Sequence, residues 1–374
     1  MKFKVATKEL KKALDTVNHA VSSVSTTPIL ENILIKVNFD NVVLISNNLE
    51  TAIEYVIKDN IEIFSEWAIC ITSKLFTQYI NLLQDDEVEL ELIRDIIEIT
   101  SVNDNFKIKW IEASEFPLIP TIREETSFNI DSKIFIKAIS KTLFSSAEWN
   151  IRPTLAGILF NINWSDAIFA STDSFRLTEY KTKLEDNINS FSWIIPSKTA
   201  SEIKSILSSS DFDKVKIISW DNWIAFFFWN TKFFSRLLNW KFPDYSTFFP
   251  TKWSTKSEIN RIDLIQALKK INLLSKENNY AIKMSFSSEF WIILETNETQ
   301  IWEWQVRLSW VVEWEDAIIW INSIFFLEVL WVIETSHISI SFESALAPIL
   351  ITPLSDPEKE TKDEFRHIIM PLKI

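Results

Sequence analysis

The feature that most constrains this chain is a sequence pattern that occurs three times along its length. The segment 3–14 recurs 125 residues later as 128–139, and 259–268 begins a third copy. A second segment also occurs three times, and its copies contain Ser73, Ser197 and Ser323, which are spaced 124 and 126 residues apart. A fixed period of this size indicates that one structural unit has been repeated. The sequence therefore predicts three similar domains, with the boundaries 1–125, 126–253 and 254–374.

Within each copy, the spacing of apolar residues alternates between two types. Helical spacing occurs over 7–20, 132–147 and 262–275, whereas strand-like alternation occurs over 41–46, 87–92, 214–219 and 338–342. The second segment of each copy has a serine before its apolar run, which predicts that this serine is a helix N-cap. Each domain is therefore expected to hold two helices separated by several strands. This arrangement predicts an α+β fold with antiparallel sheets.

Charge is distributed unevenly along the chain. The formal net charge is −13, which argues against a surface that is basic throughout. The three segments that contain the first helix of each copy nevertheless carry +3, +2 and +3. Lys133, Lys137 and Lys141 follow one another at intervals of four and are expected to share one helical face. For any single helix, exposure to solvent is enough to explain a lysine-rich face. The recurrence of such a face in the first helix of all three copies indicates contact with phosphates.

Few residues of the chain suit catalysis or metal binding. One Cys and three His argue against a disulfide framework and a zinc cluster, and a single Gly excludes a glycine-rich phosphate loop. Ser201 and Lys204 have the spacing of one serine acylase motif, but its companion motifs are missing. The charged N-terminus and the absence of a long apolar run predict a cytoplasmic protein without a membrane span. We expect no enzyme activity, no cofactor and no metal.

Six segments, in order along the chain, resemble one family. The chain is similar to the bacterial sliding clamp, the β subunit of DNA polymerase III, over its whole length. The segments that carry the resemblance are Met1–Phe3, 20–30, Arg152–Gly157, Ser171–Leu177, Phe242–Tyr245 and Ile369–Ile374. The resemblance implies a head-to-tail homodimeric ring around duplex DNA, lined by twelve helices, with the sheets outside. It also implies partners such as the replicative polymerase, the clamp loader and repair proteins.

The resemblance also assigns residues to two surfaces. An apolar pocket for partner peptides, between the second and third domains, would comprise Leu155, Thr172, Ser174, Phe175, Arg176, Leu177, Pro243, Thr247, Phe248, Ile368, Met370, Pro371 and Leu372. The side chains expected to face DNA are Lys8, Lys11, Lys12, Lys74, Lys133, Lys137, Lys141, Arg152, Lys198, Lys204, Lys269 and Lys270. Two departures stand out: Ser174–Phe175 replaces the usual Gly-His of the family, and Val24 replaces a commonly basic residue.

Two other classes of protein remain as alternatives at this stage. One is a nonenzymatic β-rich scaffold or ligand-binding protein that does not bind DNA. The other is a hydrolase that uses Ser201 and Lys204. Retention on circular DNA but not on linear DNA distinguishes the clamp from the first alternative, and turnover abolished by Ser201→Ala identifies the second.

The chain has 17 Trp and a single Gly, whereas average usage of Gly is about 7%. Several Trp stand where turns prefer Gly, as in Asn163–Trp164 between two apolar runs. We therefore hypothesise that the gene comes from a lineage that reads UGA as Gly, and that UGA is rendered here as Trp. The hypothesis predicts that the Trp lie mainly in exposed turns, many of them at positive φ. A true Trp-rich protein would instead bury most of these indoles.

Overall fold

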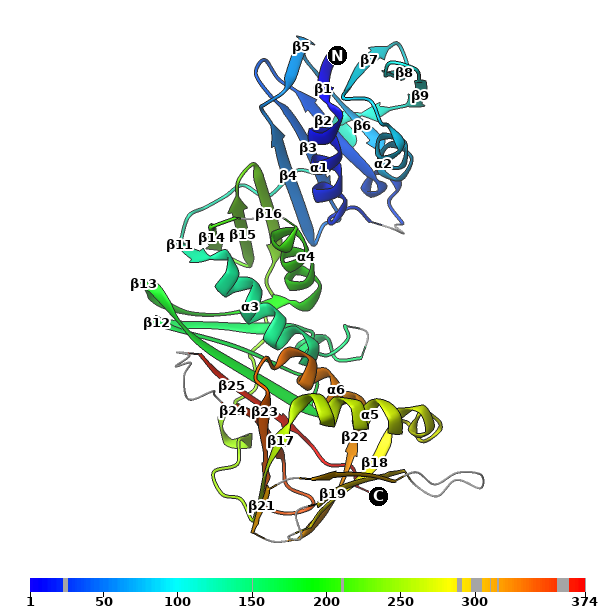
Figure 1. Cartoon of the computed structure of the whole chain (residues 1–374). Helices are drawn as coiled ribbons and strands as arrows, with labels where there is room; N and C mark the ends of the chain where they lie inside the picture. The colour runs from blue at the N-terminus through cyan, green and yellow to red at the C-terminus, as the bar shows by residue number, and fades with distance from the viewer. Residues whose placement is uncertain are drawn as a thin grey trace. The chain divides into compact units, whose positions relative to one another are not determined.

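The computed structural model forms two compact units (Figure 1). It describes residues 1–22, 26–149, 151–209, 212–287, 291–296, 305–309, 311–314, 316–354 and 363–373. Unit 1 comprises Met1–Lys133 and Glu202–Leu237, and unit 2 comprises Ile134–Ser201 and Leu238–Ile374. The three domain boundaries derived from the repeat remain a prediction.

Unit 1 contains two antiparallel sheets. The five-stranded sheet has the order β5-β1-β7-β8-β9 and consists of β1 (Lys2–Ala6), β5 (Ile61–Ser65), β7 (Glu87–Ile93), β8 (Ile96–Thr100) and β9 (Asn105–Lys109). The nine-stranded sheet has the order β10-β6-β2-β3-β4-β16-β15-β14-β11. Its strands are β2 (Asn32–Val37), β3 (Val42–Asn47), β4 (Thr51–Ile57), β6 (Trp67–Thr72), β10 (Ile111–Glu112), β11 (Thr126–Asp131), β14 (Lys214–Trp220), β15 (Trp223–Phe228) and β16 (Thr231–Arg236).

Helices α1 (Thr7–Asn18) and α2 (Ser73–Leu82) pack against each other in unit 1. The buried residues of α1 include Leu10, Ala13, Leu14 and Val17, which recur at helical spacing and form one apolar face. The opposite face carries the lysines. The helical pattern in the sequence therefore identified the buried face of α1 correctly.

Unit 2 contains the other two sheets. The seven-stranded sheet has the order β12-β13-β25-β24-β23-β17-β21, and the four-stranded sheet has the order β20-β19-β18-β22. The seven strands are β12 (Gly157–Thr172), β13 (Arg176–Pro196), β17 (Thr255–Asn260), β21 (Val311–Trp314), β23 (His337–Phe342), β24 (Ile349–Leu354) and β25 (Glu364–Ile369). The four are β18 (Ala281–Ser287), β19 (Trp291–Thr296), β20 (Gln305–Ser309) and β22 (Ala317–Asn322).

The remaining helices complete two helices for each repeat, as the sequence predicts. They are α3 (Ser132–Thr142), α4 (Ser197–Ser208), α5 (Arg261–Ser275) and α6 (Ser323–Val332). Figure 1 shows α5 and α6 side by side in unit 2, and the two helices are in contact. The prediction of an α+β fold made of three related copies is confirmed. Helix α3 is shorter than the predicted 132–147, because a 3-10 turn, Leu143–Ser145, follows it.

The N-cap prediction for the serines is wrong for α2 and α6. Both helices begin at the serine itself, and the preceding residues, Thr72 and Asn322, are the N-caps. Ser73 and Ser323 are buried, and their hydroxyls bond to Asn18 and Asn272, near the end of the first helix of the same repeat. Because these serines pack against a neighbouring helix, their hydroxyls bond to asparagine side chains of that helix and do not cap their own helix.

The tryptophans only partly follow the distribution that the Gly hypothesis predicts. The exposed ones in the described part of the chain are Trp67, Trp149, Trp164, Trp229, Trp240, Trp253 and Trp331, whereas Trp220 is buried. Positive φ occurs only at Trp164 and Trp229 among the described tryptophans, so the expectation of many such residues is wrong. Others lie in regular elements, such as Trp193 in β13 and Trp331 in α6, where φ is negative.

Candidate functional site

An apolar cavity of about 300 Å³ opens in unit 2 where the ends of several elements converge. Its walls come from the end of β12, the start of β13, the segment around the 3-10 turn Ser246–Phe248, and the end of β25. The lining residues are Leu155, Thr172, Ser174, Arg176, Leu177, Pro243, Tyr245, Phe248, Ile368 and Met370. A concave, mostly apolar surface with a few polar groups is typical of a ligand-binding site.

Nine of the thirteen residues assigned to the pocket by resemblance line this cavity, and four do not. The four outside its lining are Phe175, Thr247, Pro371 and Leu372. The exposed Phe175 ring lies 5.4 Å from the Arg152 guanidinium, and the backbone N–H of Leu372 donates to the carbonyl oxygen of Trp320 at 2.8 Å. The sequence reasoning missed Tyr245, although it ends the Phe242–Tyr245 segment that supported the resemblance.

The loop between β12 and β13 forms one wall of the cavity and has a strained backbone. Ser174 adopts φ 76°, a conformation that favours glycine. Hydrogen bonds hold the loop in this form: the Thr172 hydroxyl accepts from Ser174 N–H, and the Asp173 carboxylate accepts from Phe175 and Arg176 N–H. The backbone N–H of Met370 donates to the Phe175 carbonyl at 2.8 Å, which joins the loop to the C-terminal segment.

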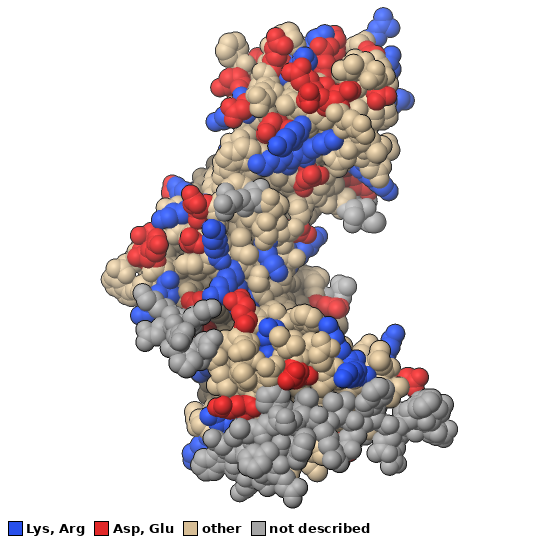
Figure 2. Space-filling model, viewed as in Figure 1, with Lys and Arg blue, Asp and Glu red and all other residues tan. Residues whose placement is uncertain are grey.

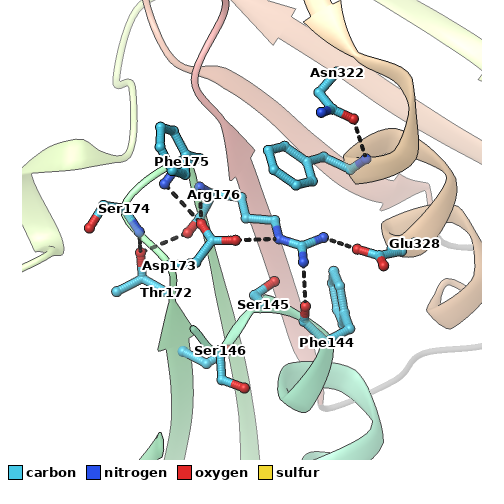
Figure 3. Close-up of polar contacts among 12 residues, drawn as sticks. Phe144, Ser145, Ser146, Thr172, Asp173, Ser174, Phe175, Arg176, Asn322 and Glu328 are labelled. Atoms are coloured by element: carbon cyan, nitrogen blue, oxygen red, sulfur yellow. Dashed lines mark hydrogen bonds and ion pairs between the residues drawn. The ribbon is translucent and has the colours of Figure 1, made fainter. Parts of the chain in front are cut away.

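The Arg176 side chain lies between the loop and α6 (Figure 3). It is 8% exposed, and its Nε donates to Asp173 Oδ2 at 2.9 Å. Its other nitrogens donate to the carboxylate of Glu328 and to the carbonyl oxygen of Phe144. A buried guanidinium needs such partners, because an unpaired charge in this environment is costly.

A buried histidine packs behind this cluster. His367 on β25 is fully buried, and its Nδ1 lies 2.7 Å from the Thr178 hydroxyl, which in turn lies 2.5 Å from the Ser145 hydroxyl. Its Nε2 has no hydrogen-bond partner among the described residues. Burial, with a smaller contribution from the nearby Arg176 charge, holds the pKa of His367 well below its usual range. The ring is therefore neutral at pH 7.

This burial predicts that the protein loses stability as the pH falls below about 6.5. In that range the unfolded chain takes up a proton at His367 and the folded chain does not. The free energy of unfolding should therefore decrease by up to about 1.4 kcal/mol per pH unit, and level off above pH 6.5. Urea unfolding between pH 5 and pH 7.5 measures this slope. His367→Gln should flatten it, and an unchanged slope in that variant would exclude His367 as its source.

A second cavity, of about 480 Å³, lies in unit 1 beside α1 and α4. Lys8, Lys11 and Lys12 line it together with Asp15 and His19. Figure 2 shows basic side chains gathered over α1. Lys11 Nζ donates to the Leu83 carbonyl oxygen at 2.6 Å, and the His19 ring pairs with Glu202 of α4. The first helix of the chain thus presents a concave basic surface.

Two of the three lysines that are expected to share one face of α3 pair with acidic residues of the same chain. Lys133 is exposed, but Lys141 is 7% exposed, pairs with Glu334 at 2.9 Å and donates to the carbonyl oxygen of Val332. Lys137 is half-buried, and its Nζ lies 2.6 Å from Asp363 Oδ2. Spacing places the three on one side of α3, but acidic residues from the third repeat pack against the second half of that side.

The other side chains expected to face DNA differ in exposure. Those that are exposed are Lys74, Lys198, Lys269 and Lys270, whereas Arg152 and Lys204 are half-buried. Val24, the departure noted at a commonly basic position, lies outside the described residues.

No group of three or more His, Cys, Asp or Glu in the described part of the chain could hold a metal ion. No described helix is long and apolar enough to span a membrane.

Comparison with known proteins gives the same result along the whole chain. Family models of the DNA polymerase III beta subunit match in order: the N-terminal domain at residues 1–120, the central domain at 129–244 and the C-terminal domain at 246–373. The beta sliding clamp of Staphylococcus epidermidis is 28% identical over 363 residues, which cover 95% of this chain and 94% of that protein. The beta sliding clamp of Bacillus subtilis is 28% identical over 366 residues, which cover 95% of this chain and 97% of that protein.

Solved structures agree with these relatives. The Bacillus subtilis DNA polymerase sliding clamp has a TM-score of 0.93 at 27% identity and covers 100% of this chain and 99% of its own. The DNA polymerase III beta chain of Streptococcus pneumoniae has a TM-score of 0.94 at 26% identity, with 100% of both chains covered. With three family models in order and relatives matched from end to end, the chain belongs to the family of the DNA polymerase III β subunit, the noncatalytic sliding clamp of bacterial replication.

Proposed function

We propose that two copies of this chain close head to tail into a ring in the cytoplasm, which encircles duplex DNA and tethers the replicative polymerase. The observation that carries this proposal is the way in which the repeats join within each unit. Since the β subunit is noncatalytic, the alternative of a hydrolase that uses Ser201 and Lys204 is wrong.

The repeats join by pairing strands at equivalent positions. In unit 1, β4 of the first repeat pairs with β16 of the second, with Tyr55 opposite Thr231. In unit 2, β13 of the second repeat pairs with β25 of the third, with Leu177 opposite Ile368. In the third repeat, β20 occupies the position of β4 and β13, and in the first repeat, β9 occupies the position of β16 and β25. Each of these two strands, β20 and β9, is the end strand of its sheet.

Unpaired strand edges at the two ends of one repeat series favour association with a further copy. A heterologous contact between β20 of one copy and β9 of another closes into a ring when the rotation allows. With three repeats in each chain, two copies would supply six similar domains. This edge complementarity supports a dimer, and a closed ring explains how a clamp holds DNA by topology rather than by tight binding.

Loading on closed and open DNA tests the proposal. A protein that encircles duplex DNA should be retained on a nicked circular plasmid after loading and should be lost when the plasmid is linearised. Loss at the same rate from both forms would support a protein that binds DNA from one side, and no association with either form would favour a scaffold or ligand-binding protein.

We further propose that the basic cavity beside α1 faces the DNA backbone. Lysine contacts with phosphates are screened by salt and do not depend on base sequence, so they permit sliding. Lys8→Gln together with Lys12→Gln should reduce the slope of log affinity against log salt by about two, or about 0.9 for each phosphate that is no longer neutralised. Fluorescence anisotropy with a short duplex over a series of salt concentrations measures this slope.

A matched control removes the same charge from a different place. Lys36→Gln together with Lys58→Gln neutralises two exposed lysines of unit 1 that do not line the cavity. This pair should leave the salt slope close to that of the unaltered protein, and neither pair should lower the melting temperature. Equal slopes for the two double variants would refute the assignment of the α1 cavity.

For the apolar cavity of unit 2, we propose the docking of linear peptides from partner proteins. An extended peptide with a few apolar anchors gains most of its affinity from desolvated contacts in a preformed pocket. The cavity has the size and the apolar walls for this role, and nine of the residues that the family resemblance assigned to peptide binding line it.

A further inference from the structure

Arg176 is the one charged side chain among the described residues that line the apolar cavity. In such a position an unpaired guanidinium would attract any carboxylate that a bound peptide carried. The partners of Arg176 therefore determine the net charge that a ligand would meet beside it. Two of these partners are carboxylates, and they come from different repeats of the chain.

The guanidinium is already engaged on its edges and on its faces. Asp173, Glu328 and the Phe144 carbonyl accept from its nitrogens, as Figure 3 shows. The Phe325 ring lies 4.4 Å from its Cζ, and the Phe144 ring lies 5.5 Å from it. A planar guanidinium that is stacked and bonded in this way has little freedom to turn toward a ligand.

The charges in this cluster do not cancel. One guanidinium is paired with two carboxylates, so the cluster carries an excess negative charge. The Asp173 side chain is 16% exposed and is also tied to the loop backbone, whereas the Glu328 side chain on α6 is 41% exposed. Glu328 does not line the cavity, so its charge acts on a ligand through Arg176 and through space.

Further charged groups lie near the cavity, and one of them, Asp244, accepts hydrogen bonds from the backbone N–H and the hydroxyl of Ser246. Glu179 accepts from the Tyr245 hydroxyl at 2.9 Å and from Arg366 Nε at 3.0 Å, and it lies 3.3 Å from Lys181 Nζ. Arg152 lies over the exposed Phe175 ring, outside the lining. The excess negative charge of the Arg176 cluster therefore lies beside the part of the cavity that Arg176 lines.

We propose that Glu328 is a specificity-determining residue: by pairing with Arg176 it makes the part of the cavity beside Arg176 reject peptides with a carboxylate there and accept neutral, apolar ones. This inference rests on the proposed role of the cavity as a peptide-docking site. Because Glu328 lies on α6, the third repeat would then influence which peptides bind beside the second repeat.

A peptide series with the full-length protein tests the proposal. The peptides are capped at both ends and carry Leu and Phe anchors, and Asp replaces Asn at each non-anchor position in turn. For the unaltered protein, at least one position should show weaker binding of the Asp peptide than of the Asn peptide. Glu328→Gln keeps the shape and an acceptor oxygen, and it should reduce that preference by about three- to tenfold. The affinity for the all-Asn peptide should stay nearly unchanged.

Glu343→Gln is the matched control, because it removes the same charge from an exposed bend after β23. It should leave the preference between Asn and Asp peptides unchanged. An equal preference in Glu328→Gln and the unaltered protein would overturn the inference, as would equal weakening of every peptide by Glu328→Gln. If the unaltered protein bound none of the peptides, the peptide-docking proposal itself would fail, and this result differs from either of the others.

Discussion

Deletion of residues 370–374 is expected to abolish peptide binding and stimulation of the polymerase while leaving the fold and the dimer intact. Met370 lines the apolar cavity, and its N–H bonds to the Phe175 carbonyl at the rim. Removing it takes away one wall and a hydrogen bond that holds the loop. Losing apolar contact area in a pocket of this kind costs roughly 2–4 kcal/mol of binding free energy, or a fall in affinity of about 30- to 700-fold.

The deletion begins just after β25, whose pairing with β13 and β24 it leaves in place. Thermal unfolding and mass measurement of the dimer should therefore change little, while isothermal titration with an apolar peptide should show the loss. Lys373→Ala, at an exposed position of the same segment, is the control and should bind normally. Peptide affinity that survived the deletion would show that this cavity is not the docking site.

Trp164→Gly and Trp229→Gly are each expected to raise the free energy of unfolding by about 1 kcal/mol, and the double variant by about 2 kcal/mol. These two residues have φ values of 59° and 46°, a region in which side chains clash with the backbone and Gly does not. Both are also more than half exposed, so little buried area is lost. Trp164 is the cleaner position, since the Trp229 ring contacts Tyr55 and Lys12.

Trp331→Gly is the contrasting variant, because Trp331 lies in α6 at negative φ. Gly inside a helix costs about 1 kcal/mol, so this variant should unfold more easily. Denaturant unfolding of the three single variants separates backbone strain from a general effect of removing indoles. Destabilisation by Trp164→Gly would count against strain at that turn. Peptide sequencing of the protein from its native cells then decides the coding hypothesis, which fails if Trp is found at 164 and 240.

Some of the architecture could be read from local patterns alone. The repeat of about 125 residues predicted three related copies, and apolar spacing predicted helices and strands that correspond to α1, α5, β3, β7, β14 and β23. Periodicity succeeds at this level because a helix or strand must bury one face, whatever it packs against. The resemblance over six segments added the family, together with most of the residues that line the apolar cavity.

Contacts between distant segments were decided only by the tertiary structure. Lys141 has the spacing of a surface lysine, yet packing against the third repeat buries it beside Glu334. The pairing of Arg176 with Glu328 joins residues 152 positions apart, and no local pattern marks either as the partner of the other. Spacing along one element determines which side chains share a face, but the burial and charge of that face depend on which distant element packs on it, and that choice is made by the fold as a whole.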